Sequence, residues 1–164
     1  MIQAAQSHNS GITYYGFDIF ESIDEQTRLK EHHTKRIMTE TNVRNTLKTT
    51  GATVKLHIGY TDHTLPKFEP DLPLDFIYID GGHSLETIDN DWTHLEKHMH
   101  AGTVVLFDDY YEDDNTAGCF LLMNNLRATG KYDIKVLSVD EVKSKPGSRQ
   151  KKDLRIGMVK LTRR

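Results

Sequence analysis

The sequence lacks the features that mark several classes of protein. It has one cysteine, Cys119, so no disulfide can form within the chain, and this predicts a reducing, cytoplasmic setting. Four prolines in 164 residues argue against collagen-like and disordered classes. No apolar run approaches the roughly 20 residues that a membrane helix needs, so we expect no membrane partner. Residues 1–20 show no basic stretch followed by an apolar block, which argues against a secretory signal.

What remains is the composition of an ordinary globular protein. Hydrophobic residues make up 37% of the chain and charged residues 27%. At roughly 150 residues per domain, the length allows one domain and leaves no room for two ordinary ones. We therefore expect residues 1–164 to form a single domain.

The net charge of −3 hides a basic C-terminal segment. Residues 143–164 hold nine Lys and Arg against one acid, Asp153. Such a segment can bind nucleic acid. However, it contains no aromatic side chain on which bases could stack. We therefore expect a solvated hairpin here and no nucleic-acid partner.

Strand-like and helix-like patterns alternate along most of the chain. A helix is predicted from an N-cap at Ser84 through Met99 and ends at Gly102. One or two exposed helices are expected within 25–50, closed by Gly51. Two central strands are apolar on both faces, as in a parallel sheet covered by helices. The fold class is therefore α/β: a Rossmann-like, doubly wound, mostly parallel sheet with an antiparallel pair at its C-terminal edge. The strands are expected at 12–17, 54–58, 76–79, 103–107, 132–137 and 154–161, and a further helix at 119–126.

Acidic residues follow the predicted parallel strands. Ligands of open α/β sheets bind beyond the carboxyl ends of the strands, which here are Asp18, Gly59, Asp80 and the pair Asp108-Asp109. A carboxylate at the position of Asp18 accepts hydrogen bonds from ribose hydroxyls in nucleotide-binding sheets. The same residue also suits a turn or a helix N-cap.

The acids of the two central strands suggest a cation. Several carboxylates at one site suit Mg²⁺ or a similar divalent ion, so Asp80, Asp108 and Asp109 are candidate ligands. An Asp-Asp pair after a strand is also typical of a plain turn. His83 follows two glycines, which let the backbone pass close to a ligand. Its imidazole suits a general base near neutral pH, or a loop histidine bonded to backbone.

Three segments carry a family resemblance. Residues 15–21 (YGFDIFE), 76–86 (FIYIDGGHSLE) and 105–110 (VLFDDY) resemble class I S-adenosylmethionine (SAM)-dependent methyltransferases. The pattern is most similar to the metal-dependent, macrocin O-methyltransferase-like enzymes that modify sugars and small molecules. The resemblance covers roughly residues 10–125, with the motifs in the right order.

The resemblance implies a role for each site residue. Asp18 would hold the ribose of SAM, and Gly59-Tyr60 would lie near the adenine, although the family often has an acidic or hydroxyl residue in place of Tyr60. Asp80 would contact the cofactor and, with Asp108 and Asp109, bind the metal. The acceptor would be the hydroxyl of a small molecule or sugar, and Asp80 or His83 would take its proton.

Two other interpretations remain open. Clustered aspartates at strand ends also occur in metal-dependent phosphoester hydrolases. A degenerate α/β domain that keeps the fold for protein contacts is the non-catalytic alternative.

The start of the chain is short for a nucleotide-binding unit. The glycine-rich turn of such a unit lies about 20 residues before the ribose-binding acid. Asp18 stands 17 positions after Met1, and the only glycines before it are Gly11 and Gly16. We therefore expect the first strand and its glycine loop to be absent, as in a fragment, a start codon assigned too late or a naturally shortened protein.

Overall fold

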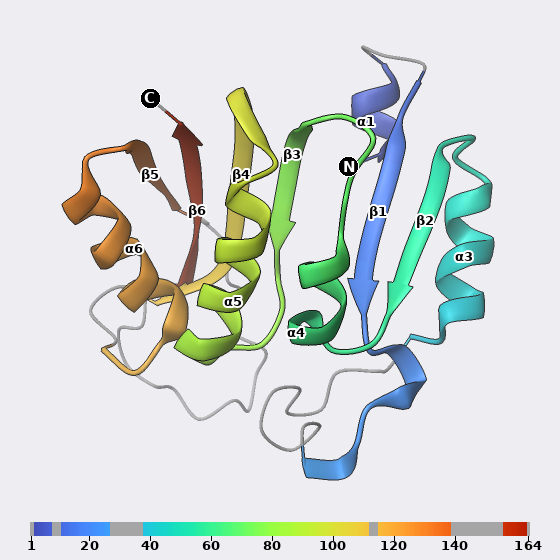
Figure 1. Cartoon of the computed structure of the whole chain (residues 1–164), viewed down its shortest axis with the longest axis horizontal. Helices are drawn as coiled ribbons and strands as arrows, with labels where there is room; N and C mark the ends of the chain where they lie inside the picture. Colours follow the sequence, from blue (N-terminus) through green and yellow to red (C-terminus); the bar gives the residue numbers. More distant parts are fainter. Residues whose placement is uncertain (1, 8–10, 27–37, 112–114, 139–155, 164) are drawn as a thin grey trace. The chain divides into compact units, whose positions relative to one another are not determined.

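The chain alternates strands with helices, as its sequence predicts. A computed structural model describes residues 2–7, 11–26, 38–111, 115–138 and 156–163. The elements in chain order (Figure 1), where η marks a short 3-10 helix, are α1 (Ile2–Gln6), β1 (Thr13–Asp18), η1 (Phe20–Ser22), α3 (Glu40–Lys48), β2 (Thr53–Ile58), α4 (Thr61–Thr64), η2 (Leu65–Lys67), β3 (Leu74–Ile79), α5 (Leu85–Glu96), β4 (Met99–Tyr111), α6 (Gly118–Thr129), β5 (Tyr132–Ser138) and β6 (Ile156–Arg163).

The strands are hydrogen-bonded in two groups. β1 and β2 form a parallel pair, and the other four form a sheet in the order β3-β4-β6-β5. These groups belong to two compact units, Met1–Phe68 and Glu69–Arg164. In the second unit β3 and β4 are parallel, whereas β6 is antiparallel to both β4 and β5. The predicted α/β class and the antiparallel C-terminal pair are confirmed, and the expectation of a single domain stays a prediction.

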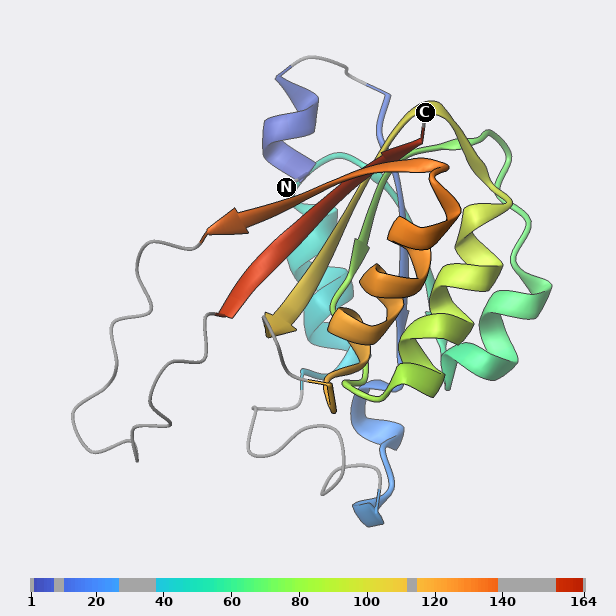
Figure 2. The same ribbon diagram turned by 90° about the vertical axis from the view of Figure 1, so that its left-hand side faces the viewer.

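The first unit is held together by an aromatic cluster on one face of its strand pair. The ring of Phe17 on β1 stacks on that of His57 on β2, with centroids 4.5 Å apart and planes at 9°. Buried Phe68 meets both rings edge-on, at 5.0 and 5.6 Å. Helices α3 and α4 lie on opposite sides of the pair (Figure 2). Asp18 at the end of β1 pairs with Ile58 at the end of β2, so the carboxyl ends of the two strands lie at the same level.

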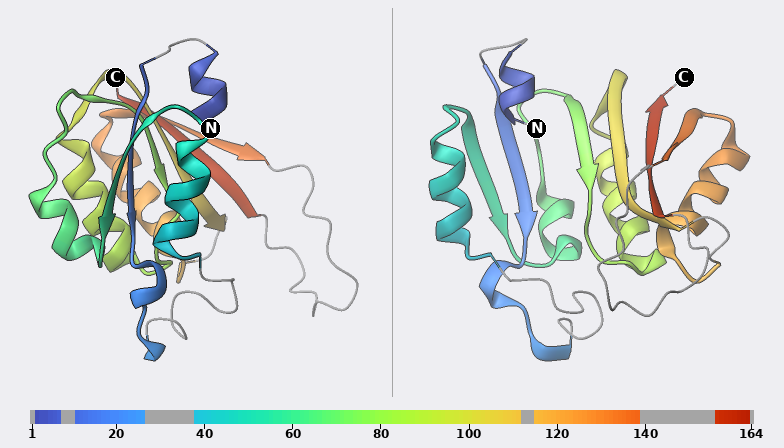
Figure 3. Two further views of the ribbon diagram at one scale, coloured as in Figure 1. Left: turned by 90° about the vertical axis from the view of Figure 1, so that its right-hand side faces the viewer. Right: turned by 180° about the vertical axis from the view of Figure 1, so that it is seen from behind.

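The second unit buries one face of its sheet beneath α5 and α6. Trp92 of α5 lies against Phe107 of β4 at 5.8 Å and against Tyr132 of β5 at 5.3 Å. The other face, seen from behind in Figure 3, carries no helix of this unit among the described residues, and Phe76 on it is 44% exposed. The fully buried side chains include Val105, Phe107, Leu122, Met123, Val159 and Leu161.

Two details of the predicted elements are corrected. The helix that begins after Ser84 ends at Glu96, not near Gly102, and Met99 already belongs to β4. Met99 is buried and pairs with Leu74 of β3. Its apolar side chain fits the spacing of one more helical turn, although the residue lies in a strand. The N-cap is confirmed, because the Ser84 hydroxyl accepts a hydrogen bond from the Thr87 amide at 3.3 Å.

Some expectations fall on residues that the structure does not describe. They are residues 27–37 of the predicted helical region 25–50, and residues 143–155 and 164 of the basic C-terminal segment. Within the described ranges, the longest helices have 12 residues, and none is long and apolar enough to cross a membrane.

Candidate functional site

The predicted acids of the second unit lie at the carboxyl ends of β3 and β4. Asp80 directly follows β3, whereas Asp108 and Asp109 lie within β4. Phe107 pairs with Val159 of β6 and Tyr110 pairs with Gly157, so two aspartates stand opposite one residue of β6. This is a β-bulge, a feature that commonly redirects side chains beside functional sites. Asp109 has a φ of 50°, an uncommon value for a residue other than glycine.

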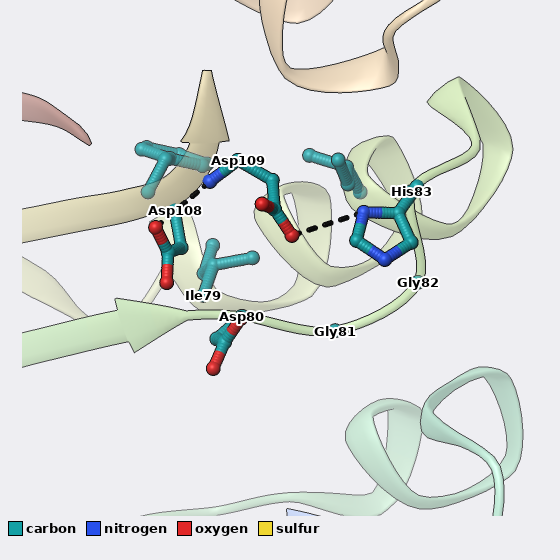
Figure 4. Close-up of a pocket in the computed structure, with 9 residues that line it drawn as sticks. Ile79, Asp80, Gly81, Gly82, His83, Asp108 and Asp109 are labelled. Atoms are coloured by element: carbon teal, nitrogen blue, oxygen red, sulfur yellow. Dashed lines mark hydrogen bonds and ion pairs between the residues drawn. The ribbon is translucent and has the colours of Figure 1, made fainter. Parts of the chain in front are cut away.

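The bulge sends the two aspartates to different partners. Asp109 faces His83, with its Oδ2 3.1 Å from Nδ1 of the imidazole (Figure 4). Its Oδ1 accepts a hydrogen bond from the Tyr111 hydroxyl at 3.2 Å. The His83 and Asp109 side chains are 34% and 26% exposed, so the pair is sheltered but reachable from solvent. The structure therefore joins His83 and Asp109 in a histidine–carboxylate pair.

Asp108 points away from this pair. Its Oδ2 accepts a hydrogen bond from the Tyr78 hydroxyl at 2.8 Å, and its Oδ1 accepts one from the Asp109 amide at 2.9 Å. In Figure 4 the Asp80 carboxylate is directed away from His83, on the same side as the Asp108 carboxylate. The three predicted metal ligands are thus divided into Asp80 and Asp108 on one side and Asp109 on the other.

The carboxylates concentrate negative charge at this end of the sheet. The pKa of the Tyr78 hydroxyl is raised, first by burial and then by its hydrogen bond to Asp108, with the charges of Asp80 and Asp109 adding to the effect. Burial also raises the pKa of the Cys119 thiol to about 12, and the Asp109 and Asp108 charges contribute. A site with this electrostatic field favours a cationic ligand.

The donor geometry does not match the predicted metal site. Both oxygens of Asp108 and both of Asp109 already face protein donors or the His83 ring. In the part of the chain that the structure describes, no group of three or more His, Cys, Asp or Glu side chains is arranged to hold a metal ion. These side chains in this arrangement do not form a cation site, so the divalent cation stays a prediction.

A small pocket lies between the ends of β3 and β4. Its volume of about 10 Å³ is close to the space that one water molecule occupies. It is lined by Ile79, Asp80, Gly81, Gly82, His83, Ile88, Phe107, Asp108 and Asp109 (Figure 4). The pocket can place a small polar group beside the His83–Asp109 pair, but a whole substrate does not fit inside it.

The first unit has a larger pocket at the carboxyl end of β2. Its volume is about 400 Å³, and its walls are His57, Ile58, Gly59, Tyr60, His63, Thr64 and Lys67. Nε2 of His57 is buried and has no hydrogen-bond partner among the described residues. The pKa of His57 is lowered, mainly by burial and further by the Lys55 charge. The Tyr60 hydroxyl donates a hydrogen bond to the Asp24 carboxylate, which fixes its ring at the pocket wall.

Asp18 and Gly59 are joined at the end of the strand pair. The Gly59 amide donates a hydrogen bond to the Asp18 carbonyl at 3.0 Å, and the exposed Asp18 carboxylate accepts one from the Phe20 amide at 2.7 Å. Gly59 has a φ of 130°, where a side chain would be strained. The structure thus brings together Asp18, Gly59 and Tyr60, the predicted cofactor residues of this unit.

Several site residues are not identifiable from the sequence pattern. Tyr78 and Tyr111 orient the aspartates, but tyrosines in and after a strand look like ordinary strand residues. His57 lies within a predicted strand, and the sequence pattern does not mark it as a site residue. Successive side chains of a strand point to opposite faces, so Tyr78 is expected on the same face as Asp80. This placement is the one signal in the sequence that links Tyr78 to the site.

Comparisons with known proteins identify the fold and the family of the chain. A family model described as a methyltransferase domain matches residues 1–110. No curated protein matches the chain significantly.

Among solved structures, an O-methyltransferase from Bacillus cereus in complex with S-adenosylhomocysteine (SAH) has a TM-score of 0.62 and 12% identity, over 99% of this chain and 79% of that one. TomG, an O-methyltransferase from Streptomyces achromogenes in complex with SAM, has a TM-score of 0.60 and 14% identity, over 99% and 77%.

Cofactor-bound Rv0187 from MTB has a TM-score of 0.57 and 14% identity, over 92% of this chain. This chain spans only 61% of the length of Rv0187. These likenesses establish the Rossmann-like α/β methyltransferase fold. Because the family model covers two thirds of the sequence, the chain belongs to the family of methyltransferase domains.

Proposed function

We propose that this methyltransferase domain transfers a methyl group from SAM to a hydroxyl oxygen of a small molecule or sugar. The observation that carries the proposal is the His83–Asp109 pair, held at 3.1 Å at the carboxyl ends of β3 and β4. A hydroxyl acceptor must lose a proton as its oxygen attacks a methyl carbon. A histidine oriented by a carboxylate is a suitable acceptor for that proton near neutral pH.

The first unit offers residues that fit the adenosyl part of SAM. A pocket of about 400 Å³ lies within the roughly 300–1,000 Å³ that small-ligand sites occupy. The buried Nε2 of His57 needs a hydrogen-bond partner that a ligand could supply. We assign the ribose hydroxyls to Asp18 and the adenine to Gly59 and Tyr60.

The second unit supplies the residues for the chemistry. SAM, when bound, provides a methyl group on a positively charged sulfur. The carboxylates of Asp80, Asp108 and Asp109 create a negative field that favours such a cation. Asp109 engages Nδ1 of His83, so Nε2 is the nitrogen assigned to receive the acceptor's proton. Placing the acceptor in line with the methyl carbon supplies much of the rate.

Two finer assignments remain part of the proposal. Asp80 is assigned as a further cofactor contact because it follows β3 at the rim and is exposed. The sequence also predicts Mg²⁺ at Asp80, Asp108 and Asp109. The observed arrangement of these acids does not form a cation site, and the roles proposed for His83 and Asp109 do not depend on a metal.

The test is transfer of a labelled methyl group from SAM to a panel of phenols, catechols and sugars, with this chain as the enzyme. We expect labelled product from at least one hydroxyl compound and none from its O-methylated counterpart. Repeating the assay with EDTA tests the metal assignment, because full activity in chelator removes it. Release of phosphate from model esters without methyl transfer would instead identify a hydrolase.

A further inference from the structure

His83 is held by more than its partner Asp109. The short loop Gly81–His83 lies in the connection between β3 and α5 and is in contact with the beginning of α6 and with the side of α5. If His83 is the proton acceptor of the proposed function, on which this inference rests, then these contacts decide where its ring lies. A misplacement of about 1 Å in a catalytic group can lower a rate by as much as 10²-fold.

The first contact is a backbone hydrogen bond. Helix α6 begins at Gly118, and its N-cap residue, Ala117, offers no side-chain acceptor. The amide of Gly118 instead donates to the carbonyl oxygen of His83 at 3.1 Å. The unsatisfied amide at the start of α6 is therefore paired with the backbone of the histidine itself.

The second contact is a close approach of two backbones. Gly118 is buried, and a Cβ atom placed on it would lie 2.6 Å from the Leu85 nitrogen and from the Ser84 carbonyl carbon. Such distances are too short for real atoms, so any side chain at this position must force the starts of α5 and α6 apart. Since Ser84 directly follows His83, the displacement would move the histidine.

The third contact is a buried carboxylate. Asp91 on α5 is 6% exposed, and its Oδ1 accepts a hydrogen bond from the side-chain Nδ2 of Asn90 at 3.2 Å. A Cβ placed on Gly81 would lie 3.2 Å from Oδ2 of Asp91, so this oxygen faces the loop backbone. Burying a carboxylate costs free energy unless polar groups hydrogen-bond to it or pair with it. The buried Asp91 is therefore a specific feature of the surroundings of this loop.

We propose that Gly118 and Asp91 are positioning residues, which hold the Gly81–His83 loop so that Nδ1 of His83 meets Asp109. Neither residue touches the reacting groups in this assignment. Gly118 fixes the His83 backbone from α6, Asp91 supports the loop from α5, and Asp109 fixes the ring from β4. The start of α6 thereby becomes part of the catalytic geometry.

The test observes the ring of His83 directly, by ¹⁵N NMR of the histidine side chains, with H83Q to assign the signal. A hydrogen bond from Nδ1 to Asp109 places the proton of the neutral ring on Nδ1. We expect this tautomer in the wild type and its loss to a mixture of both tautomers in D109N. The measurement needs neither cofactor nor acceptor, so it is independent of whether SAM binds.

The decisive variants are G118A and D91N, with G102A as the matched control. Alanine favours a helix over glycine by about 1 kcal/mol, so helix propensity alone predicts a harmless G118A. A Cβ at Gly102 meets only the His100 side chain among the described residues. We expect folded G118A and D91N to lose the Nδ1–H tautomer of His83 and G102A to keep it.

Several results would overturn the proposal. Folded G118A and D91N that keep the wild-type tautomer show that the contacts do not position His83. If His83 in the wild type lacks the Nδ1–H tautomer, the hydrogen bond from His83 to Asp109 that Gly118 and Asp91 are proposed to position does not form. If G118A does not fold, D91N decides, and if neither folds the two residues are purely structural.

Discussion

At the scale of single residues, the site depends on which direction each aspartate takes. Asp108 and Asp109 are adjacent in the sequence, yet one receives the Tyr78 hydroxyl and the other faces His83. The division follows from the bulge in β4 and from the left-handed backbone of Asp109. The two residues therefore have different expected roles, although the sequence treats them as a pair.

Replacing His83 tests its role as proton acceptor. A general base contributes about 10²–10⁴-fold to a rate, so H83Q should lower kcat by that factor in the labelled methyl-transfer assay. D109N should act in the same direction, because the ring loses its fixed orientation.

The same unit provides a matched control for both substitutions. His100 and Asp75 form a histidine–carboxylate pair with the same separation, 3.1 Å, and Asp75 is 94% exposed. H100Q and D75N should leave kcat unchanged. Equal losses in both pairs would mean that the His83 effect is one of stability and not of chemistry.

His57 predicts how stability depends on pH. Its pKa is lowered in the folded chain, first by burial and then by Lys55, so the unfolded chain binds the proton more readily. The free energy of unfolding should therefore be fully retained above about pH 6.5, the unperturbed histidine pKa, and should fall as the pH drops below it.

Urea unfolding at pH 7, 6 and 5 measures this dependence. H57F keeps a ring against Phe17 but cannot be protonated, so the slope with pH should decrease. H63F is the control, since the His63 side chain is 76% exposed. An unchanged slope in H57F would assign the pH dependence to other groups.

At the scale of the elements, helix α6 ends at a glycine with a left-handed backbone. Gly130 has a φ of 66°, and a Cβ placed on it would meet no other described residue within 4 Å. G130A should therefore cost only backbone strain, about 1–2 kcal/mol in the free energy of unfolding. Asparagine tolerates this conformation better than alanine, so G130N should cost less. Equal stability of G130A and wild type in urea would contradict the assigned cap.

The elements were predictable from local patterns, and the site only in part. Ser84 predicted the start of α5, and the apolar runs predicted β3 and β4, because periodicity and caps are local properties. The extra residue at Asp108-Asp109 is defined by its partner strand β6, some fifty positions later. Local sequence therefore predicted the strand ends at which the acids lie but not the direction of each aspartate side chain.

The boundary between α5 and β4 shows the same limit. Met99 continues the helical spacing of Leu95, and only its pairing with Leu74 makes it a strand residue. Tyr78 and Gly118 likewise acquire their roles from neighbours distant in the sequence, at Asp108 and His83. Contacts of this kind are outside the reach of periodicity.

At the scale of the whole molecule, family membership and site geometry support the same function. The family model covers residues 1–110, which include every residue assigned to the cofactor and to the chemistry. The first unit carries the adenosyl assignment and the second carries the proton acceptor. Binding of the cofactor is the property that both require.

Titration of the chain with SAH by calorimetry tests the central claim most directly. We predict that one equivalent binds, that binding raises the unfolding temperature, and that ligand at 100 times Kd adds about 2.7 kcal/mol of stability. D18N should weaken binding, and D75N, a carboxylate change of the same kind at an exposed site, should not. If SAH produces neither heat nor a shift in unfolding temperature at millimolar concentration, the proposed methyl transfer by this chain is wrong.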